Sequence, residues 1–211
     1  DLLAHQGYSV QAIEGISLAS VVPPVTELVI ETLRDYVKIE PLIVGGGVKT
    51  GVAIRYDSPR EVGADRVADA AAAYALYGGP ACVVDFGTAT TFNAISDKGE
   101  YLGGAIAPGV RTATEALFQA TAKLPRIDLQ RPPKAIGANT VDAMRSGILF
   151  GYVGLVEGMV ERFRRELGPA MRVIGTGGLA SFIAAETPVI QVVDPWLTLK
   201  GLRIIYELNR K

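Results

Sequence analysis

The stretch Ala81–Ser96, ACVVDFGTATTFNAIS, decides the fold. It opens with apolar and β-branched residues, passes through a segment of glycine and threonine, and ends in a second apolar run. This pattern predicts a buried strand that delivers one carboxylate, Asp85, to its end and then turns tightly at Gly87. Gly87 lets the backbone approach a ligand closely, and Thr88 and the threonines after it add hydrogen-bonding groups without bulk. The turn suits a phosphate chain, with Asp85 positioned to hold a cation or a water, but an ordinary β-hairpin fits this stretch equally well.

The composition narrows the class of protein. A chain of 211 residues can bury a sizeable core as one large domain or two small ones. Its net charge of −1 gives no basic surface for nucleic acid, and no apolar run is long enough to span a bilayer. The single cysteine, Cys82, lies in an apolar run, which predicts a core residue in a reducing compartment. We therefore expect a cytoplasmic protein with no nucleic-acid or membrane partner.

Short apolar runs alternate with segments of helical spacing along the chain. Strands are expected over Gly15–Val22, Pro41–Val44, Gly51–Tyr56, Ala81–Ala107 (a strand and a hairpin), Met171–Ile174 and Pro188–Val193. Helices are expected over Asp1–Gly7, Val25–Val37, Asp57–Gly79, Gly109–Gln119, from Asn139 or Thr140 to Leu167, and Trp196–Leu208. This alternation is typical of a layered α/β fold.

The predicted helix over Asp57–Gly79 begins with a capping box formed by Ser58 and Glu61. Its first turns contain the segment Gly63–Arg66, GADR. Gly63 costs about 1 kcal/mol of helix stability relative to alanine, which is useful if something must approach the helix closely. The two charged residues of this segment suit either solvated surface positions or a catalytic site.

Two further segments contain conspicuous glycines. In the predicted helix that ends at Leu167, four glycines spaced four, three and four residues apart share one face: Gly147, Gly151, Gly154 and Gly158. Such a face lets another helix pack closely, either within the chain or from a second copy. Near the C-terminus, a strand is followed by Gly175-Thr176-Gly177-Gly178 and then a helix, an arrangement suited to nucleotides but weak evidence alone.

Together these motifs resemble a known family. VVDFGTATTF and the GTGG turn resemble the second phosphate motif and the adenosine motif of the acetate and sugar kinase/Hsp70/actin superfamily. With IRYDSPREVGADR, GEYLGGAIAPGV and IGANTVDAMRSG, the chain resembles type III pantothenate kinase from about Gly15 to its C-terminus. The resemblance implies an α/β fold of two ribonuclease-H-like domains of the actin-like ATPase superfamily. Residues 1–64 would be the remainder of the first domain, and residues 65–211 the second, which carries the phosphate and adenosine motifs.

The resemblance also implies a reaction. Members of this family transfer the γ-phosphoryl group of ATP to the primary hydroxyl of pantothenate, the first step of coenzyme A biosynthesis. The expected cofactors are ATP, Mg²⁺ and a monovalent cation, K⁺ or NH₄⁺. The expected partners are pantothenate and a second copy of the chain, which would form a homodimer through the helix Thr140–Leu167.

The implied site residues match the family's motifs position by position. Asp65 would be the general base, and Gly63, Ala64, Asp65 and Arg66 would hold pantothenate. Tyr56 and Thr140 would be further substrate contacts, with Thr140 reaching in from the second subunit. Asp85 would bind the monovalent cation, Gly87 and Thr88 the ATP phosphates, and Gly175, Gly177 and Gly178 the adenosine side.

One motif of the family is absent. The first phosphate motif, Asp-x-Gly-Asn-Thr, does not occur, so we expect the sequence to start inside the first domain and this chain alone to be inactive. The alternatives are an inactive dimerisation module and an accessory transcriptional regulator of the same family. The absence of a clustered basic face argues against direct DNA binding.

Overall fold

A computed structural model describes residues 2–210, and of Leu2 and Ala4 only the backbone. The strands are β1 Ser17–Leu18, β2 Leu42–Ile43, β3 Ala53–Ile54, β4 Ala81–Phe86, β5 Ala89–Ile95, β6 Glu100–Pro108, β7 Arg172–Thr176 and β8 Val192–Val193. The α-helices are α1 Leu2–His5, α2 Pro23–Tyr36, α3 Ala64–Tyr77, α4 Val110–Ala120, α5 Thr140–Leu167, α6 Ala180–Ala184 and α7 Leu197–Asn209. Two short 3₁₀ helices, η1 and η2, span Val10–Ala12 and Pro59–Glu61.

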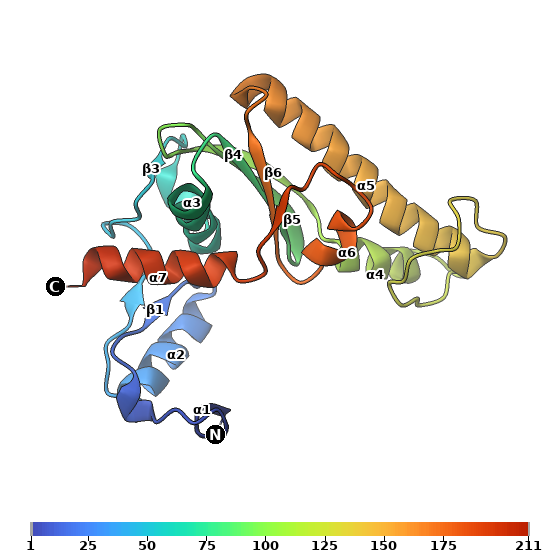
Figure 1. Cartoon of the computed structure of the whole chain (residues 1–211). Helices are drawn as coiled ribbons and strands as arrows, with labels where there is room; N and C mark the ends of the chain where they lie inside the picture. The colour runs from blue at the N-terminus through green and yellow to red at the C-terminus, as the bar shows by residue number, and fades with distance from the viewer. Residues whose placement is uncertain (1, 211) are drawn as a thin grey trace.

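A six-stranded sheet in the order β3-β6-β5-β4-β7-β8 forms the centre of the molecule (Figure 1). Its middle strands β4, β5 and β6 are antiparallel neighbours, whereas β7 runs parallel to β4. The hairpin predicted within Ala81–Ala107 is therefore confirmed, as is the mixed α/β class. A separate parallel pair, β1 and β2, lies near the N-terminus with α2.

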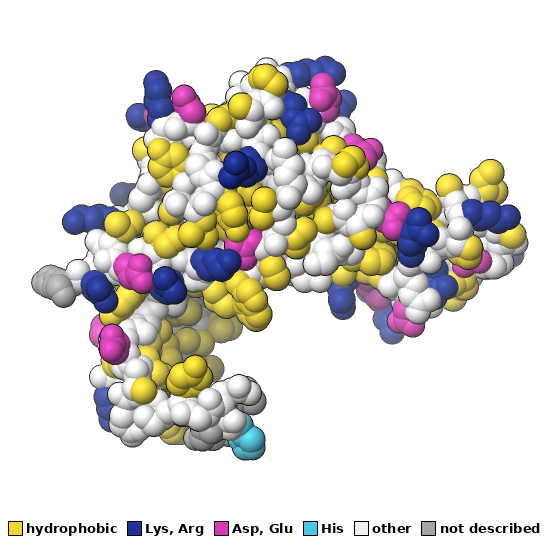
Figure 2. All heavy atoms as spheres, in the orientation of Figure 1, with side chains coloured by type: hydrophobic (Ala, Val, Ile, Leu, Met, Phe, Trp, Pro, Cys, Tyr) yellow, Lys and Arg dark blue, Asp and Glu magenta, His cyan; other side chains and the backbone are white. Residues whose placement is uncertain are grey.

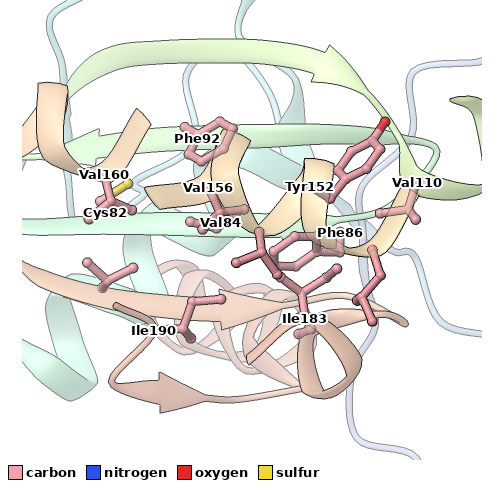
Figure 3. Close-up of a cluster of buried hydrophobic side chains, with 14 of the residues drawn as sticks. Cys82, Val84, Phe86, Phe92, Val110, Tyr152, Val156, Val160, Ile183 and Ile190 are labelled. Atoms are coloured by element: carbon pink, nitrogen blue, oxygen red, sulfur yellow. The ribbon is translucent and has the colours of Figure 1, made fainter. Parts of the chain in front are cut away.

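Helices cover both faces of the large sheet. Because successive residues of a strand point to opposite faces, Val83 joins a core with α3 and α7, whereas Val84 joins a core with α5 and α6. Figure 3 shows the second core, in which Cys82 packs beside Val160. Burial raises the pKa of the Cys82 thiol to about 12, so this side chain is a buried thiol, as predicted.

The predicted helix over Asp57–Gly79 is wrong at its start. Residues Pro59–Glu61 form η2, and α3 begins only at Ala64, with Gly63 as its N-cap. The capping box does not form, because Glu61 N donates its hydrogen bond to the backbone oxygen of Ser58 at 2.9 Å and not to the Ser58 side chain. The extended backbone of Val62 breaks the helix and buries the Val62 side chain, which has 9% exposure, in the core beside α3.

Several predicted strands are too long. The expected strands Gly15–Val22, Pro41–Val44, Gly51–Tyr56 and Pro188–Val193 each shrink to two residues that pair in register with a neighbouring strand. Pro23 and Pro24, which follow the first of these segments, begin α2. Gly175 and Thr176, expected in a turn, belong to β7.

The helix α2 has the predicted apolar spacing but buries none of its residues. Leu28 is 64% exposed and Tyr36 is 80% exposed, because the two-residue strands β1 and β2 offer little surface to cover them. Figure 2 shows hydrophobic side chains at the surface in this part of the molecule, below α7. None of the helices built from the described residues is both long enough and apolar enough to cross a membrane.

The glycine face of α5 is open within the chain. A Cβ placed on Gly147, Gly151 or Gly154 would meet no atom within 4 Å, so no helix of the described chain packs closely against these positions. The predicted start of this helix is confirmed, because the Asn139 side chain caps it by accepting a hydrogen bond from Asp142 N at 2.9 Å.

The closest helix contact lies between α7 and α3. A Cβ on Gly201 of α7 would collide with the carbonyl of Ala68 in α3, so only glycine fits at this crossing. The same helix reaches the N-terminal segment, where the Asn209 side chain donates to Lys49 O at 2.7 Å and accepts from Lys49 N at 3.0 Å. The C-terminal helix therefore joins the N-terminal segment to the large sheet.

We predict that Gly201→Ala lowers the free energy of unfolding by about 1–3 kcal/mol, because the added methyl group pushes α7 away from α3. Helix propensity alone would favour alanine by about 1 kcal/mol, so a net loss of stability would show that the added methyl group collides with α3. Urea denaturation measures the change, and Leu199→Ala, which puts alanine at a position of α7 with 57% exposure, is the control. Equal stability of Gly201→Ala and the wild type would contradict the close contact.

Candidate active site

Asp85 lies near the end of β4, on the face of the sheet that α3 covers. It pairs with Thr91 of β5 on one side and with Thr176 of β7 on the other. Burial raises the pKa of the Asp85 carboxyl above its usual range, and the negative charge of Asp65 raises it further. Gly177 has a φ of +86°, and a Cβ there would collide with the Asp85 carboxylate and the Phe86 backbone. The site thus has one partly buried carboxylate against a glycine backbone.

The turn between β4 and β5 is fastened to the start of α4. Gly87 N donates to Ala89 O at 3.1 Å, which closes the tight turn that the sequence predicts. The carbonyl of Thr88 accepts from Gly109 N at 3.1 Å and from the Thr112 hydroxyl at 2.8 Å. Because its backbone is held in this way, Thr88 presents an exposed side chain at the end of the sheet.

The segment Gly63–Arg66 forms the first turn of α3. Asp65 is exposed, and its Oδ1 accepts a hydrogen bond from Arg66 N at 2.8 Å. A Cβ on Gly63 would lie 2.5 Å from the same oxygen, so the close approach that Gly63 allows is that of the Asp65 carboxylate itself. The N-terminal end of a helix favours a negative charge, so a carboxylate suits this position.

Arg66 and Tyr56 meet through a residue that the sequence analysis missed, Tyr101. The Arg66 guanidinium carbon lies 5.6 Å from the centre of the Tyr101 ring, and the rings of Tyr101 and Tyr56 are 6.3 Å apart. Arg66 Nε also donates to Asn93 Oδ1 at 2.8 Å. Tyr56 and Arg66, expected to contact one substrate, are thus brought to one place on the α3 face of the sheet.

A cavity of about 570 Å³ opens beside the start of α3. Gly63 and Ala64 line it, opposite the glycine loop Gly45–Gly47. Two of the expected substrate residues therefore border a space large enough for a small molecule.

A third acidic residue, Asp69, lies one turn after Asp65 and was also missed. It is 1% exposed, accepts a hydrogen bond from the Thr198 hydroxyl at 2.7 Å, and its Oδ2 has no hydrogen-bond partner among the described residues. Burial raises the pKa of Asp69 from 3.8 to about 7, and the charges of Asp85 and Asp65 contribute to this shift. The spacing of four from Asp65 was a signal that could have located it.

Two expected site residues lie elsewhere. Thr140 is exposed at the start of α5, at the opposite side of the molecule from α3 in Figure 1, where it lines a second hollow with Leu117 and Leu124. Gly175 lies inside β7, where a Cβ would contact Ile190 at 3.0 Å. Gly178, in contrast, is in the turn after β7 and has open space beside it.

The donor set fits a cation that arrives with phosphate. Within residues 2–210 there is no group of three or more His, Cys, Asp or Glu side chains that could hold a metal by itself. Mg²⁺ is commonly held by one or two carboxylates together with substrate phosphates, and Asp85 beside the β4–β5 turn supplies that kind of partial site.

These features define a class of protein: an α/β fold with a tight glycine turn beside an acidic site, an arrangement compatible with a kinase. The model of a protein family described as "Type III pantothenate kinase" matches residues 1–162 of this chain. The curated type III pantothenate kinase of Moorella thermoacetica is 57% identical over 98% of this chain and 82% of its own length. That of a Geobacillus species is 54% identical over 99% of this chain and 81% of its own length. The chain belongs to the type III pantothenate kinase family.

A solved structure shows the same fold. The crystal structure reported for a conserved protein assigned to the Baf family of transcriptional activators, from Campylobacter jejuni, covers 99% of this chain and 88% of its own, with a TM-score of 0.63. Its sequence identity of 21% supports a shared fold and nothing more specific.

We predict that Asp69→Asn stabilises the protein above pH 7 by roughly 2–4 kcal/mol and changes little below pH 4. In the wild type the pKa of Asp69 is about 7 in the folded state against 3.8 ordinarily, so the folded protein keeps a proton that the unfolded chain loses. The contribution of this group to stability is therefore complete below about pH 4 and is lost as the pH rises through 7. Urea unfolding across this pH range measures it, and parallel curves for the two proteins would refute the assignment.

Proposed function

We propose that the protein phosphorylates the primary hydroxyl of pantothenate with ATP, giving 4′-phosphopantothenate in the first step of coenzyme A biosynthesis. The observation that carries this function is the arrangement of Asp65 and Arg66 over the sheet face that also presents Asp85. The electrostatic effect of Asp65 on the pKa of Asp85 reflects this proximity. Relatives with 52–57% identity bear the name of this enzyme.

Asp65 is the proposed general base. A primary alcohol is a poor nucleophile at neutral pH, so a carboxylate that accepts its proton assists the attack. The hydroxyl oxygen forms a bond to the γ-phosphorus, the bond from that phosphorus to the β–γ bridging oxygen breaks, and the hydroxyl proton passes to Asp65. The exposure of Asp65 and its anchorage by Arg66 N support this role.

The other residues bind and align the substrates. Gly63, Ala64, Arg66 and Tyr56 would hold pantothenate. The cavity beside α3 supports this for Gly63 and Ala64, which line it, and the contacts with Tyr101 support it for Arg66 and Tyr56. Gly87 and Thr88 would face the ATP phosphates, and Gly177 and Gly178, with Gly175 beneath them, would lie on the adenosine side. Alignment and charge stabilisation supply most of the catalysis in phosphoryl transfer.

Asp85 would hold the monovalent cation, K⁺ or NH₄⁺, and face the Mg²⁺ that accompanies ATP. When bound, these cations offset the negative charge of the phosphates. The partly buried Asp85 carboxylate against the Gly177 backbone is the feature that supports this role.

At the level of domains, we propose two ribonuclease-H-like units, residues 1–64 and 65–211, in a cytoplasmic enzyme. The separate strand pair β1–β2 supports a distinct first unit, although β3 pairs with β6 across the boundary. We further propose a homodimer through α5. The open glycine face supports it, and a second subunit would supply Thr140, which in this chain lies at the start of α5 beside Leu117 and Leu124.

We predict that Asp65→Asn lowers kcat by 10²–10⁴-fold while the KM for ATP stays near the wild-type value, because the amide cannot accept the hydroxyl proton. Asp85→Asn is the comparison variant, in which the base remains and the response to K⁺ weakens. A coupled assay of ADP release, with both substrates and K⁺ varied, measures these changes in the full-length protein. A folded Asp65→Asn enzyme with near-wild-type kcat would remove Asp65 from the mechanism and leave it only its effect on the helix end, about 1 kcal/mol of stability.

We predict that Gly151→Leu shifts the protein from dimer to monomer, because a leucine cannot enter a closely packed helix interface without strain of about 1–3 kcal/mol or more. Multi-angle light scattering measures the assembly, and a thermal melt verifies that the variant is folded. Arg203→Leu, which adds a leucine at an exposed position of α7, is the control. A Gly151→Leu protein that remains a stable dimer would rule out this face as the interface.

A further inference from the structure

The polar cluster around Asn93 suggests a role that no motif assigned. Asn93 lies on β5 and is fully buried, yet its side chain makes three hydrogen bonds. Its Oδ1 accepts from Arg66 Nε at 2.8 Å and from the Tyr101 hydroxyl at 3.3 Å, and its Nδ2 donates to Thr91 Oγ1 at 3.2 Å. We propose that Asn93 is a positioning residue that, together with Tyr101, fixes the Arg66 guanidinium for binding the anionic substrate. This inference rests on the proposed function.

The orientation of the Asn93 amide is determined by its partners. Arg66 Nε is a donor and cannot accept, so the oxygen of the amide must face Arg66. The Tyr101 hydroxyl donates to the same oxygen, and burial raises the pKa of Tyr101 to about 12, which keeps that hydroxyl protonated. A buried amide whose donor and acceptor are both engaged holds one geometry.

Tyr101 faces Arg66 because of an irregularity in the strand pairing. Ala94 pairs with Gly103 but Ile95 pairs with Tyr101, so Leu102 is an extra residue in β6. Gly103 has a φ of +118°, a conformation that glycine adopts without strain. Without this bulge Tyr101 would point to the opposite face of the sheet, away from α3. The bulge therefore places the ring 5.6 Å from the guanidinium carbon, within reach of a cation–π interaction.

Space for the guanidinium comes from Gly104, which pairs directly with Asn93. A Cβ at Gly104 would collide with the carbonyl of Phe92 and lie 3.3 Å from Arg66 Nη2. The strand can thus pass close to the arginine only with glycine at this position.

The positive charge of Arg66 is not neutralised within the described chain. No carboxylate of residues 2–210 lies within 4.0 Å of its guanidinium, although eight other pairs of charged side chains do form such contacts. An arginine held at Nε and on its ring face, without a carboxylate partner, can offer its Nη groups to a planar anion. Pantothenate carries a carboxylate of this kind.

A double-mutant cycle tests the assignment. Pantothenate binding is measured by calorimetry without ATP, and kcat and KM by ADP release, for the wild type, Asn93→Leu, Arg66→Ala and the double variant. Asn93→Leu is expected to weaken pantothenate binding about 10-fold or more, since it removes a hydrogen bond to a charged group, while the KM for ATP is unchanged. In the Arg66→Ala background, Asn93→Leu should have no further effect on binding, because Asn93 acts through Arg66.

Thr187→Val is the matched control, because it also removes a hydrogen bond from a buried residue to a charged one, that of the Thr187 hydroxyl to Glu157 at 2.7 Å on the other face of the sheet. Its pantothenate affinity should equal that of the wild type. If Asn93→Leu does not fold, Asn93→Ser carries the same cycle, since its hydroxyl is too short to reach Nε.

The outcomes separate the two hypotheses. Wild-type affinity in folded Asn93→Leu, or an equal loss in both backgrounds, overturns the positioning role and leaves the proposed function intact. A full-length wild-type protein that neither binds nor phosphorylates pantothenate overturns the proposed function and this assignment with it.

Discussion

The close crossing of α3 and α7 is the contact on which the site depends. At Gly201 the two helices approach so closely that a methyl group would strike the Ala68 carbonyl, and this fixes the position of α3 over the sheet. The start of α3 carries Asp65 and Arg66, so the same crossing fixes both relative to Asp85 on β4. Through Asn209 and Lys49, α7 also attaches the N-terminal segment. Helix α7, which is far from Asp65 and Asp85 in the sequence, therefore determines how these residues are arranged.

Three carboxylates share this region in three different environments. Asp65 is exposed and anchored at a helix N-terminal end, Asp85 is partly buried against Gly177, and Asp69 is almost wholly buried with one oxygen unpaired. Burial disfavours the charged form, and it raises the pKa of the Asp85 carboxyl above its usual range and that of Asp69 to about 7. These different environments are consistent with the separate roles proposed for Asp65 and Asp85.

In the proposed reaction, alignment of the substrates contributes more than covalent assistance, and Arg66 would serve this alignment. A flexible arginine would lose side-chain entropy on binding a substrate, at a cost of up to about 2 kcal/mol. Asn93, Tyr101 and the gap at Gly104 hold the side chain before any ligand arrives. Because the strand bulge and the buried amide already hold Arg66 in the folded protein, part of this side-chain entropy is lost on folding and not on substrate binding.

The sequence by itself determined the elements whose signals are local. The hairpin after Ala81 follows from apolar runs around Gly87, the start of α5 from the cap at Asn139, and the family from its motifs. Only the tertiary structure decided where helix α3 begins, because the burial of Val62 overrides the capping signal at Ser58. It also decided that Asn93 and Tyr101 meet Arg66. Strand alternation shows which residues share a face of the sheet. Which helix covers that face, and which residues a bulge moves to the other face, depends on contacts between residues far apart in the chain.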